Sequence, residues 1–158
     1  MAVNLGAVAL TGRVRARTVA PDGTLLRDTG WVGNVTCNGM ADAVASWLAN
    51  VNNRGQNPVH TPQYVMLGTG SGTPAITDTT LFTPDTSTLV PVTLQRVGTT
   101  PNTTEWVAVW GPNFAAVSAT EAGLMTQAET LFAHVMITIA LTPGTTTSVQ
   151  WVVTVTPG

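Results

Sequence analysis

Apolar residues recur at every second position through most of this chain, and that period belongs to β-strands rather than to helices. The clearest run extends from Leu131 to Leu141, where both alternating sets are apolar, so we expect this strand to lie centrally or in a subunit contact. A second alternating run follows at 148–155, and the intervening Pro143-Gly144 predicts a hairpin between the two. Further strands are expected at 5–20, 24–35, 64–67, 89–97 and 105–110, the first two joined by a turn at 21–23.

One segment has the period of a helix instead. Asn38 is a suitable N-cap, and a single apolar stripe follows it, made of Met40, Val44, Trp47, Leu48 and Val51. We therefore expect a single domain over residues 1–158 that is mainly β with one α-helix near 39–53, built as a compact β-sandwich or barrel-like body. Residues 1–12 are a candidate extended arm, and residues 13–158 are the expected β-rich body.

Charge is scarce in this chain. It contains no lysine, and only six Arg, five Asp and three Glu carry charge among its 158 residues. Charged residues make up 9% of the chain, against about 25% in a typical soluble domain. A chain with so few acids, bases and nucleophiles is poorly supplied for catalysis, and we expect no enzymatic activity. So few charges also leave much of the surface poorly protected against association, so we expect it to be buried against other subunits.

The same composition argues against two classes of partner. The formal net charge is −2 and the arginines form no dense cluster, which disfavours nucleic-acid binding because phosphate neutralisation needs clustered cations. No stretch approaches the 18 or so continuous apolar residues of a membrane span. The first ten residues lack the positive leader of a signal peptide, so the sequence predicts a soluble protein made in the cytoplasm.

The sequence contains almost no motif of a catalytic, cofactor-binding or metal-binding site. The glycine-rich segment 67–74 lacks the lysine of a phosphate-binding loop, so we interpret it as a plain connection. His60 and His134 lie far apart in sequence, which disfavours a zinc site, and His134 is expected to be a hydrogen-bonded wall residue of its strand. Cys37 is expected to be a small buried apolar residue, with a reactive thiol as the minor alternative. The sequence predicts no catalytic, cofactor-binding or metal-binding residues.

Two segments are candidates for partner contact. Arg13, Arg15 and Arg17 share one face of the first expected strand, which is interpreted either as a solvated face or as a charged ribbon that meets carboxylates on another subunit. The uncharged segment 2–9 either extends the first strand within its own domain or adds to a neighbouring chain through backbone hydrogen bonds. The candidate contact residues are Ala2, Val3, Asn4, Leu5, Ala7, Val8, Arg13, Arg15 and Arg17.

Four segments carry a resemblance to known proteins. They are 64–74 (YVMLGTGSGTP), 78–82 (DTTLF), 120–125 (TEAGLM) and 131–135 (LFAHV). Their order resembles that of small structural proteins from tailed bacteriophages. With the chain length, the threonine-rich β character and the extended N-terminal segment, the chain is similar to the capsid decoration (cement) proteins of long-tailed phages that infect Thermus.

The resemblance implies a tulip-like β body that assembles as a homotrimer on the outside of the virion capsid and stabilises the lattice of the major capsid protein. It implies synthesis in the host cytoplasm and no cofactor. It also implies thermostability, which in a chain with three Glu and no Lys would have to come from apolar interfaces and β packing rather than from ion-pair networks.

Two other functions remain open beside the decoration protein. The chain could be another virion component, such as a tail or fibre protein. It could also be a carbohydrate-binding or adhesin module, because Trp31, Trp106, Trp110 and Trp151 lie in expected strands where aromatic rings stack on sugars.

Overall fold

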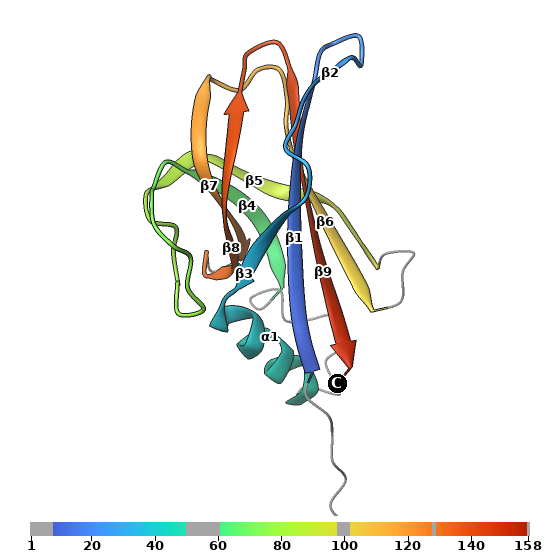
Figure 1. Cartoon of the computed structure of the whole chain (residues 1–158), viewed down its shortest axis with the longest axis vertical. Coiled ribbons are helices and arrows are strands. Elements are labelled where there is room, and N and C mark those ends of the chain that lie inside the picture. The colour runs from blue at the N-terminus through green and yellow to red at the C-terminus, as the bar shows by residue number, and fades with distance from the viewer. Residues whose placement is uncertain (1–7, 50–60, 98–101, 128, 158) are drawn as a thin grey trace, which may run out of the picture.

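The computed structural model describes residues 8–49, 61–97, 102–127 and 129–157, and within these residues the chain forms a closed β-barrel (Figure 1). Eight strands follow one another around the barrel in the order β1-β3-β8-β7-β4-β5-β6-β9, and β9 pairs back with β1 to close it. The short strand β2 is an additional pairing on β1. All these neighbours are antiparallel. The expectation of a mainly β fold with one helix is confirmed, and the body is a barrel.

The strands are long relative to the chain. Their bounds are β1 Val8–Val19, β2 Leu25–Asp28, β3 Val32–Thr36, β4 Pro62–Gly68, β5 Pro84–Val97, β6 Thr103–Trp110, β7 Val117–Thr126, β8 Leu131–Leu141 and β9 Thr146–Pro157. The helix α1 spans Asn38–Ala49 between β3 and β4.

Closure depends mainly on the pairing of β1 with β9. These strands pair over twelve consecutive positions, from Val8 with Pro157 to Val19 with Thr146. Of the candidate arm at 1–12, residues 8–12 therefore lie in the barrel wall of their own chain, and residues 1–7 lie outside the described residues. The pairing with β9 occupies one edge of β1 along its whole length, which prevents that edge from adding to other chains.

The hairpin at residues 21–23 is confirmed, but its second strand is interrupted. Gly23 has φ 85°, which glycine adopts without a steric penalty, and its amide donates to the Ala20 carbonyl at 2.9 Å. The expected strand 24–35 divides at residues 29–31, where Gly30 has φ 68°. The resulting strands, β2 and β3, both pair with β1, and β3 also pairs with β8.

The expected hairpin between the last two strands is wrong. The segments 131–141 and 146–157 are strands, but β8 pairs with β3 and β7 while β9 pairs with β1 and β6 (Figure 1). The turn with Gly144 at φ 83° reverses the chain without joining its flanking strands. A turn motif specifies the local reversal, whereas lateral pairing is decided by which edges remain open in the barrel.

Strand β7 was not predicted from the sequence. Its middle contains Glu121 and Gly123, which interrupt the apolar alternation and lower the expected strand propensity. Both residues are nevertheless buried. Glu121 in particular has a specific role in the tertiary structure.

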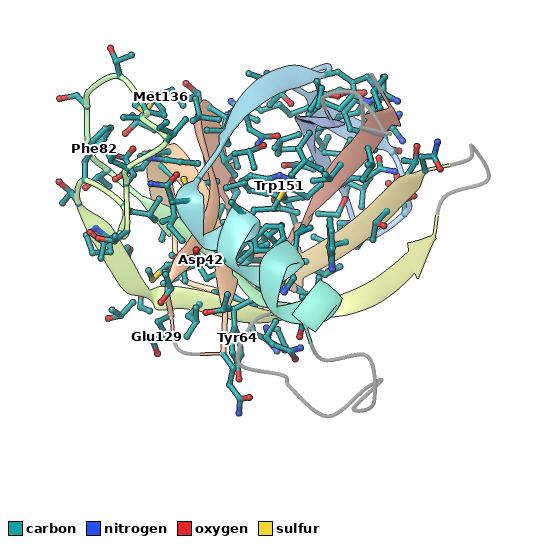
Figure 2. The ribbon with its side chains drawn as sticks, turned by 90° about the horizontal axis from the view of Figure 1, so that it is seen from below. Asp42, Tyr64, Phe82, Glu129, Met136 and Trp151 are labelled. Carbon is teal, nitrogen blue, oxygen red and sulfur yellow. The ribbon has the colours of Figure 1, made fainter. Side chains whose placement is uncertain are left out.

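The barrel interior is filled by side chains, and α1 lies across one end of it. Figure 2, seen from that end, shows Trp151 in the middle of the barrel beneath the helix. Met40 and Ala43 of α1 belong to the same buried core as Trp151. The expected stripe is confirmed at Met40, while the side chains at 47 and 48 and residue 51 lie outside the described residues. Phe132, the extra residue of a bulge opposite Leu124 and Met125, also belongs to this core.

Replacement of Trp151 by alanine tests the core. Trp151 is fully buried between Val149 and Val153, so Trp151→Ala should lower the free energy of unfolding by about 3–5 kcal/mol in urea denaturation. Val155→Ala, at an exposed position of the same strand, is the matched control and should cost less than about 1 kcal/mol. An unchanged unfolding midpoint for Trp151→Ala would contradict the assigned register of β9.

Candidate functional site

A long loop between β4 and β5 covers part of the outer surface of the barrel. This loop, residues 69–83, contains most of the glycine-rich segment and lies beside β7 and β8 (Figure 1). A second, smaller hydrophobic cluster lies beneath it and is separate from the barrel core. Its buried members are Cys37, Met66, Leu81, Met125 and Leu131. The loop is therefore packed onto the barrel and has a core of its own.

The side chain of Glu121 holds the loop to β7. Its carboxylate is fully buried and accepts three backbone hydrogen bonds from the loop. Oε1 accepts from the amides of Gly70 at 3.0 Å and Thr83 at 2.8 Å, and Oε2 accepts from the amide of Phe82 at 3.0 Å. One carboxylate thus joins the two ends of a loop whose contact points are separated by more than ten positions in the sequence.

His134 completes this arrangement from β8. Its Nε2 lies 2.9 Å from Oε2 of Glu121, and its Nδ1 lies 2.8 Å from Oδ2 of Asp78 in the loop. Because ionised carboxylates only accept hydrogen bonds, both contacts are satisfied when both ring nitrogens carry a proton. The ring also packs against Phe82, with centroids 4.8 Å apart. We call Asp78, Glu121 and His134, with the loop amides they bind, the loop clamp.

The glycines of the loop are explained by the clamp. A Cβ atom on Gly68 or on Gly70 would lie 2.5 Å from Oε1 of Glu121, and one on Gly72 would lie 2.8 Å from the Phe82 ring. Real Cβ atoms do not approach other atoms so closely, so only glycine lets the backbone reach the carboxylate. The interpretation of 67–74 as a plain connection is therefore incomplete, because its glycines form the wall of a buried ionic site.

The clamp favours the ionised state of its carboxylates. Burial alone would raise the pKa of Glu121, but the hydrogen bonds from Thr83, Phe82, His134 and Gly70 outweigh it and lower that pKa below its ordinary value. The pKa of Asp78 is lowered in the same way, since its bonds to the Ala75 amide and to His134 outweigh burial.

The polar atoms of the clamp hold the loop in place. Both nitrogens of His134 and both oxygens of Glu121 have hydrogen-bond partners. Cys37 is buried nearby, and burial, with the charge of Asp78, raises the pKa of its thiol to about 12. The expectations of a buried Cys37 and a hydrogen-bonded His134 are confirmed. In the part of the chain that the structure describes, no group of three or more His, Cys, Asp or Glu could hold a metal ion.

The clamped loop presents apolar side chains to the outside. Ile76 is 60% exposed near the middle of the loop, and Phe82 is 40% exposed near its end. Figure 2 shows Phe82 on the loop at the side of the barrel, away from the interior that holds Trp151. The loop therefore carries exposed apolar groups while the clamp beneath it is buried and hydrogen-bonded.

The arginines predicted as partner contacts lie on the outer face of β1. Val14, Ala16 and Thr18 are buried on the opposite face, as the alternation predicts. Arg15 binds the carboxylate of Asp28 with two nitrogens, its Nε at 2.8 Å, and Nε of Arg17 lies 3.3 Å from the same carboxylate. The hydrogen bond from Arg15 holds the pKa of Asp28 well below its usual range. Two of the three arginines therefore meet a carboxylate of their own chain.

Arg13 differs from the other two arginines. Its guanidinium carbon lies 4.5 Å from the centre of the Trp31 ring, and that of Arg15 lies 5.9 Å from the same centre. The other predicted contacts are at the start of the chain. Val8 begins β1, and Ala2, Val3, Asn4, Leu5 and Ala7 lie outside the described residues.

Three of the four tryptophans proposed as a sugar platform lie inside the barrel. Trp106, Trp110 and Trp151 are each at most 3% exposed and belong to the hydrophobic core. They cannot stack on a sugar at the surface. Trp31 alone among these four is exposed, and its ring is already covered in part by arginine.

A small pocket lies away from the clamp, near the β1–β2 hairpin. Its volume is about 130 Å³, below the roughly 300 Å³ at which small-molecule sites begin. Its lining residues are Thr18, Leu26, Arg27, Ala140, Thr142 and Thr145.

Comparison with known proteins finds no matching family model, no matching curated protein and no matching solved structure. Among the described residues, no helix has the length and apolar character needed to cross a membrane.

Sequence signals for the clamp were present but ambiguous. Glycines at positions 68, 70 and 72 and an acidic residue within an apolar segment at 121 are both unusual. Nothing in the sequence states that these segments meet, because Glu121 and its loop partners are separated by 38 to 51 positions.

The clamp predicts a dependence of stability on pH. Because folding lowers the pKa of Glu121 and of Asp78, their contribution is complete above the ordinary carboxyl pKa of about 4 and is lost as the pH falls through the folded values. Glu121→Gln should lower the free energy of unfolding at pH 7 by about 3–5 kcal/mol, since it removes a buried charge and replaces one acceptor oxygen by an NH2 group that faces hydrogen-bond donors. It should also flatten the loss of stability on acidification.

Urea denaturation between pH 7 and pH 3 measures both effects. Asp85→Asn, which changes a carboxylate at the start of β5 outside the clamp, is the control and should retain the wild-type slope. Equal slopes for Glu121→Gln and the wild type would show that Glu121 does not contribute to acid stability.

Proposed function

We propose that this protein is a virion structural protein that binds the outer surface of a capsid as a homotrimer and stabilises the lattice of the major capsid protein. The observation that carries the proposal is the clamped loop. Its exposed Ile76 and Phe82 belong to a loop that is held by a cluster of hydrogen-bonded charged side chains. A loop held in this way supplies contact area at a low entropic cost, which suits a permanent binding role.

The four segments that resemble phage structural proteins support the same proposal. Each of them contributes to the clamp or to its hydrophobic cluster: Gly70 from the first, Asp78 and Phe82 from the second, Glu121 from the third and His134 from the fourth. The resemblance therefore involves the residues that shape one surface.

A tail or fibre component remains the second candidate within the same class. The same loop surface would serve there, so binding to purified capsids and to purified tails separates the two. The adhesin alternative loses most of its basis, because Trp106, Trp110 and Trp151 are buried.

Replacement of Ile76 by aspartate tests the loop surface. Ile76 is 60% exposed, so Ile76→Asp should change the free energy of unfolding by no more than about 0.5 kcal/mol. The affinity for capsids, measured by co-sedimentation, should fall at least tenfold, about 1.4 kcal/mol. Val155→Asp introduces the same charge at an exposed apolar position of β9 and should bind as the wild type does. Wild-type capsid binding by Ile76→Asp would remove the loop from the contact.

Deletion of residues 2–7 tests the N-terminal segment. We expect this segment to add to a neighbouring subunit or to the capsid through backbone hydrogen bonds. The deletion leaves β1 intact, since that strand begins at Val8. Folding should therefore persist while capsid binding falls at least tenfold, as measured by co-sedimentation. Unchanged capsid binding would contradict a role for the segment in that contact.

A further inference from the structure

The charges of this chain are divided between two regions. Residues 13–31, which comprise most of β1 and the β2 hairpin, contain four of the six arginines and two of the eight acidic residues, so their formal charge is +2. The rest of the chain contains two arginines and six acidic residues, so its formal charge is −4. With only 14 charges in the whole chain, this separation makes one surface positive on an otherwise acidic molecule.

Arg13 carries the available positive charge on the outer face of β1, whereas Arg27, which pairs with the inward-facing Thr18, lies on the other face of the hairpin. Arg15 and Arg17 share Asp28, whereas Arg13 makes no ion pair within the described residues and lies over the ring of Trp31. Trp31 remains 38% exposed under this contact. Stacking orders the guanidinium and leaves its N–H groups for a carboxylate, and Arg and Trp are the residues that most often dominate binding surfaces.

Two carboxylates elsewhere on the molecule are equally available. Asp42 on α1 and Glu129 in the β7–β8 turn are exposed, and their side chains make no hydrogen bond or ion pair among the residues that the structure describes. Figure 2, seen from the α1 end of the barrel, shows both at this end. The other acidic side chains of the described residues have partners, namely Asp22, Asp28, Asp78, Asp85, Glu105 and Glu121.

We propose that the Arg13–Trp31 pair of one subunit binds Asp42 and Glu129 of a second copy of this chain. The two surfaces lie on different parts of the barrel, so the contact joins unlike surfaces and repeats from copy to copy. Such head-to-tail contacts close into a ring when the rotation between subunits allows it. The inference deepens the homotrimer of the proposed function, because it identifies the surfaces that join its subunits.

A second copy is favoured over nucleic acid by the charges themselves. The unpaired charge at this site is a single guanidinium on a molecule of net charge −2, which attracts phosphate backbones weakly. A copy of the same chain supplies two free carboxylates on a surface with few other charges. The pairing also accounts for the exposed Arg13–Trp31 stack and for two carboxylates that have no ion-pair partner among the described residues.

Charge reversal and its compensation test the contact. Light scattering over a concentration series gives the assembly state and the concentration at half assembly. Arg13→Glu should raise that concentration at least tenfold, about 1.4 kcal/mol, and the double variant Asp42→Arg with Glu129→Arg should do the same. The triple variant, which combines all three changes, again pairs opposite charges and should return to within about threefold of the wild type.

Two further variants keep the test decisive. Arg27→Glu changes the net charge of the hairpin by the same amount at an exposed position of β2, and it should assemble as the wild type does. Trp31→Ser removes the stacking surface without changing any charge, and it should weaken assembly as well. A monomeric wild type, wild-type assembly by Arg13→Glu, failure of the triple variant to recover, or equal weakening by Arg27→Glu would each overturn the proposal.

The outcome is separable from that of the proposed function. Assembly that follows this charge pattern in a protein that does not bind capsids would sustain the contact and refute the capsid role. A monomer that binds capsids would refute the contact between subunits and sustain the capsid role.

Discussion

The buried carboxylate of Glu121 is the interaction on which the outer surface of this barrel depends. An ionised side chain in a fully buried position is tolerated only when it is paired and hydrogen-bonded, and this one receives three backbone amides and an imidazole. Each of those donors comes from the loop or from β8. The charge therefore favours this conformation of the loop 69–83, because another conformation removes the three amide donors from the buried carboxylate.

Several other features follow from this constraint. The glycines at 68 and 70 are needed because a Cβ atom would collide with the carboxylate, and Phe82 lies against His134 because its own amide is bound to Glu121. The second hydrophobic cluster forms beneath the loop once its ends are fixed. A buried ion pair contributes little net stability compared with a well-packed apolar group, but it penalises alternative packings strongly. Its value here lies in holding a specific loop shape.

The closure of the barrel and the clamp fix different parts of the structure. The twelve-position pairing of β1 with β9 closes the sheet and removes both strands' facing edges from strand addition, whereas β3 pairs with β8 at only two positions. The proposed side-chain contacts lie on other parts of the surface. Ile76 and Phe82 offer an apolar contact on the loop, and Arg13 with Trp31 offers a charged aromatic contact on β1. Because so few other charges surround them, each contact stands out against a largely neutral surface.

The sequence by itself determined the β class, the single helix, the inner and outer faces of β1 and the burial of Trp151 and Cys37. These follow from periods of two or 3.6 residues, which act over a few neighbouring positions and can be recognised in the chain alone. Strand β7 was not predicted because Glu121 interrupts its apolar alternation. The pairing of β8 with β9 was predicted wrongly because a turn does not specify which strands become lateral neighbours. The clamp was decided only by the tertiary structure. Its carboxylate, its imidazole and its loop amides become one site when β7 and β8 pair and the loop packs across them, and no local pattern encodes that meeting.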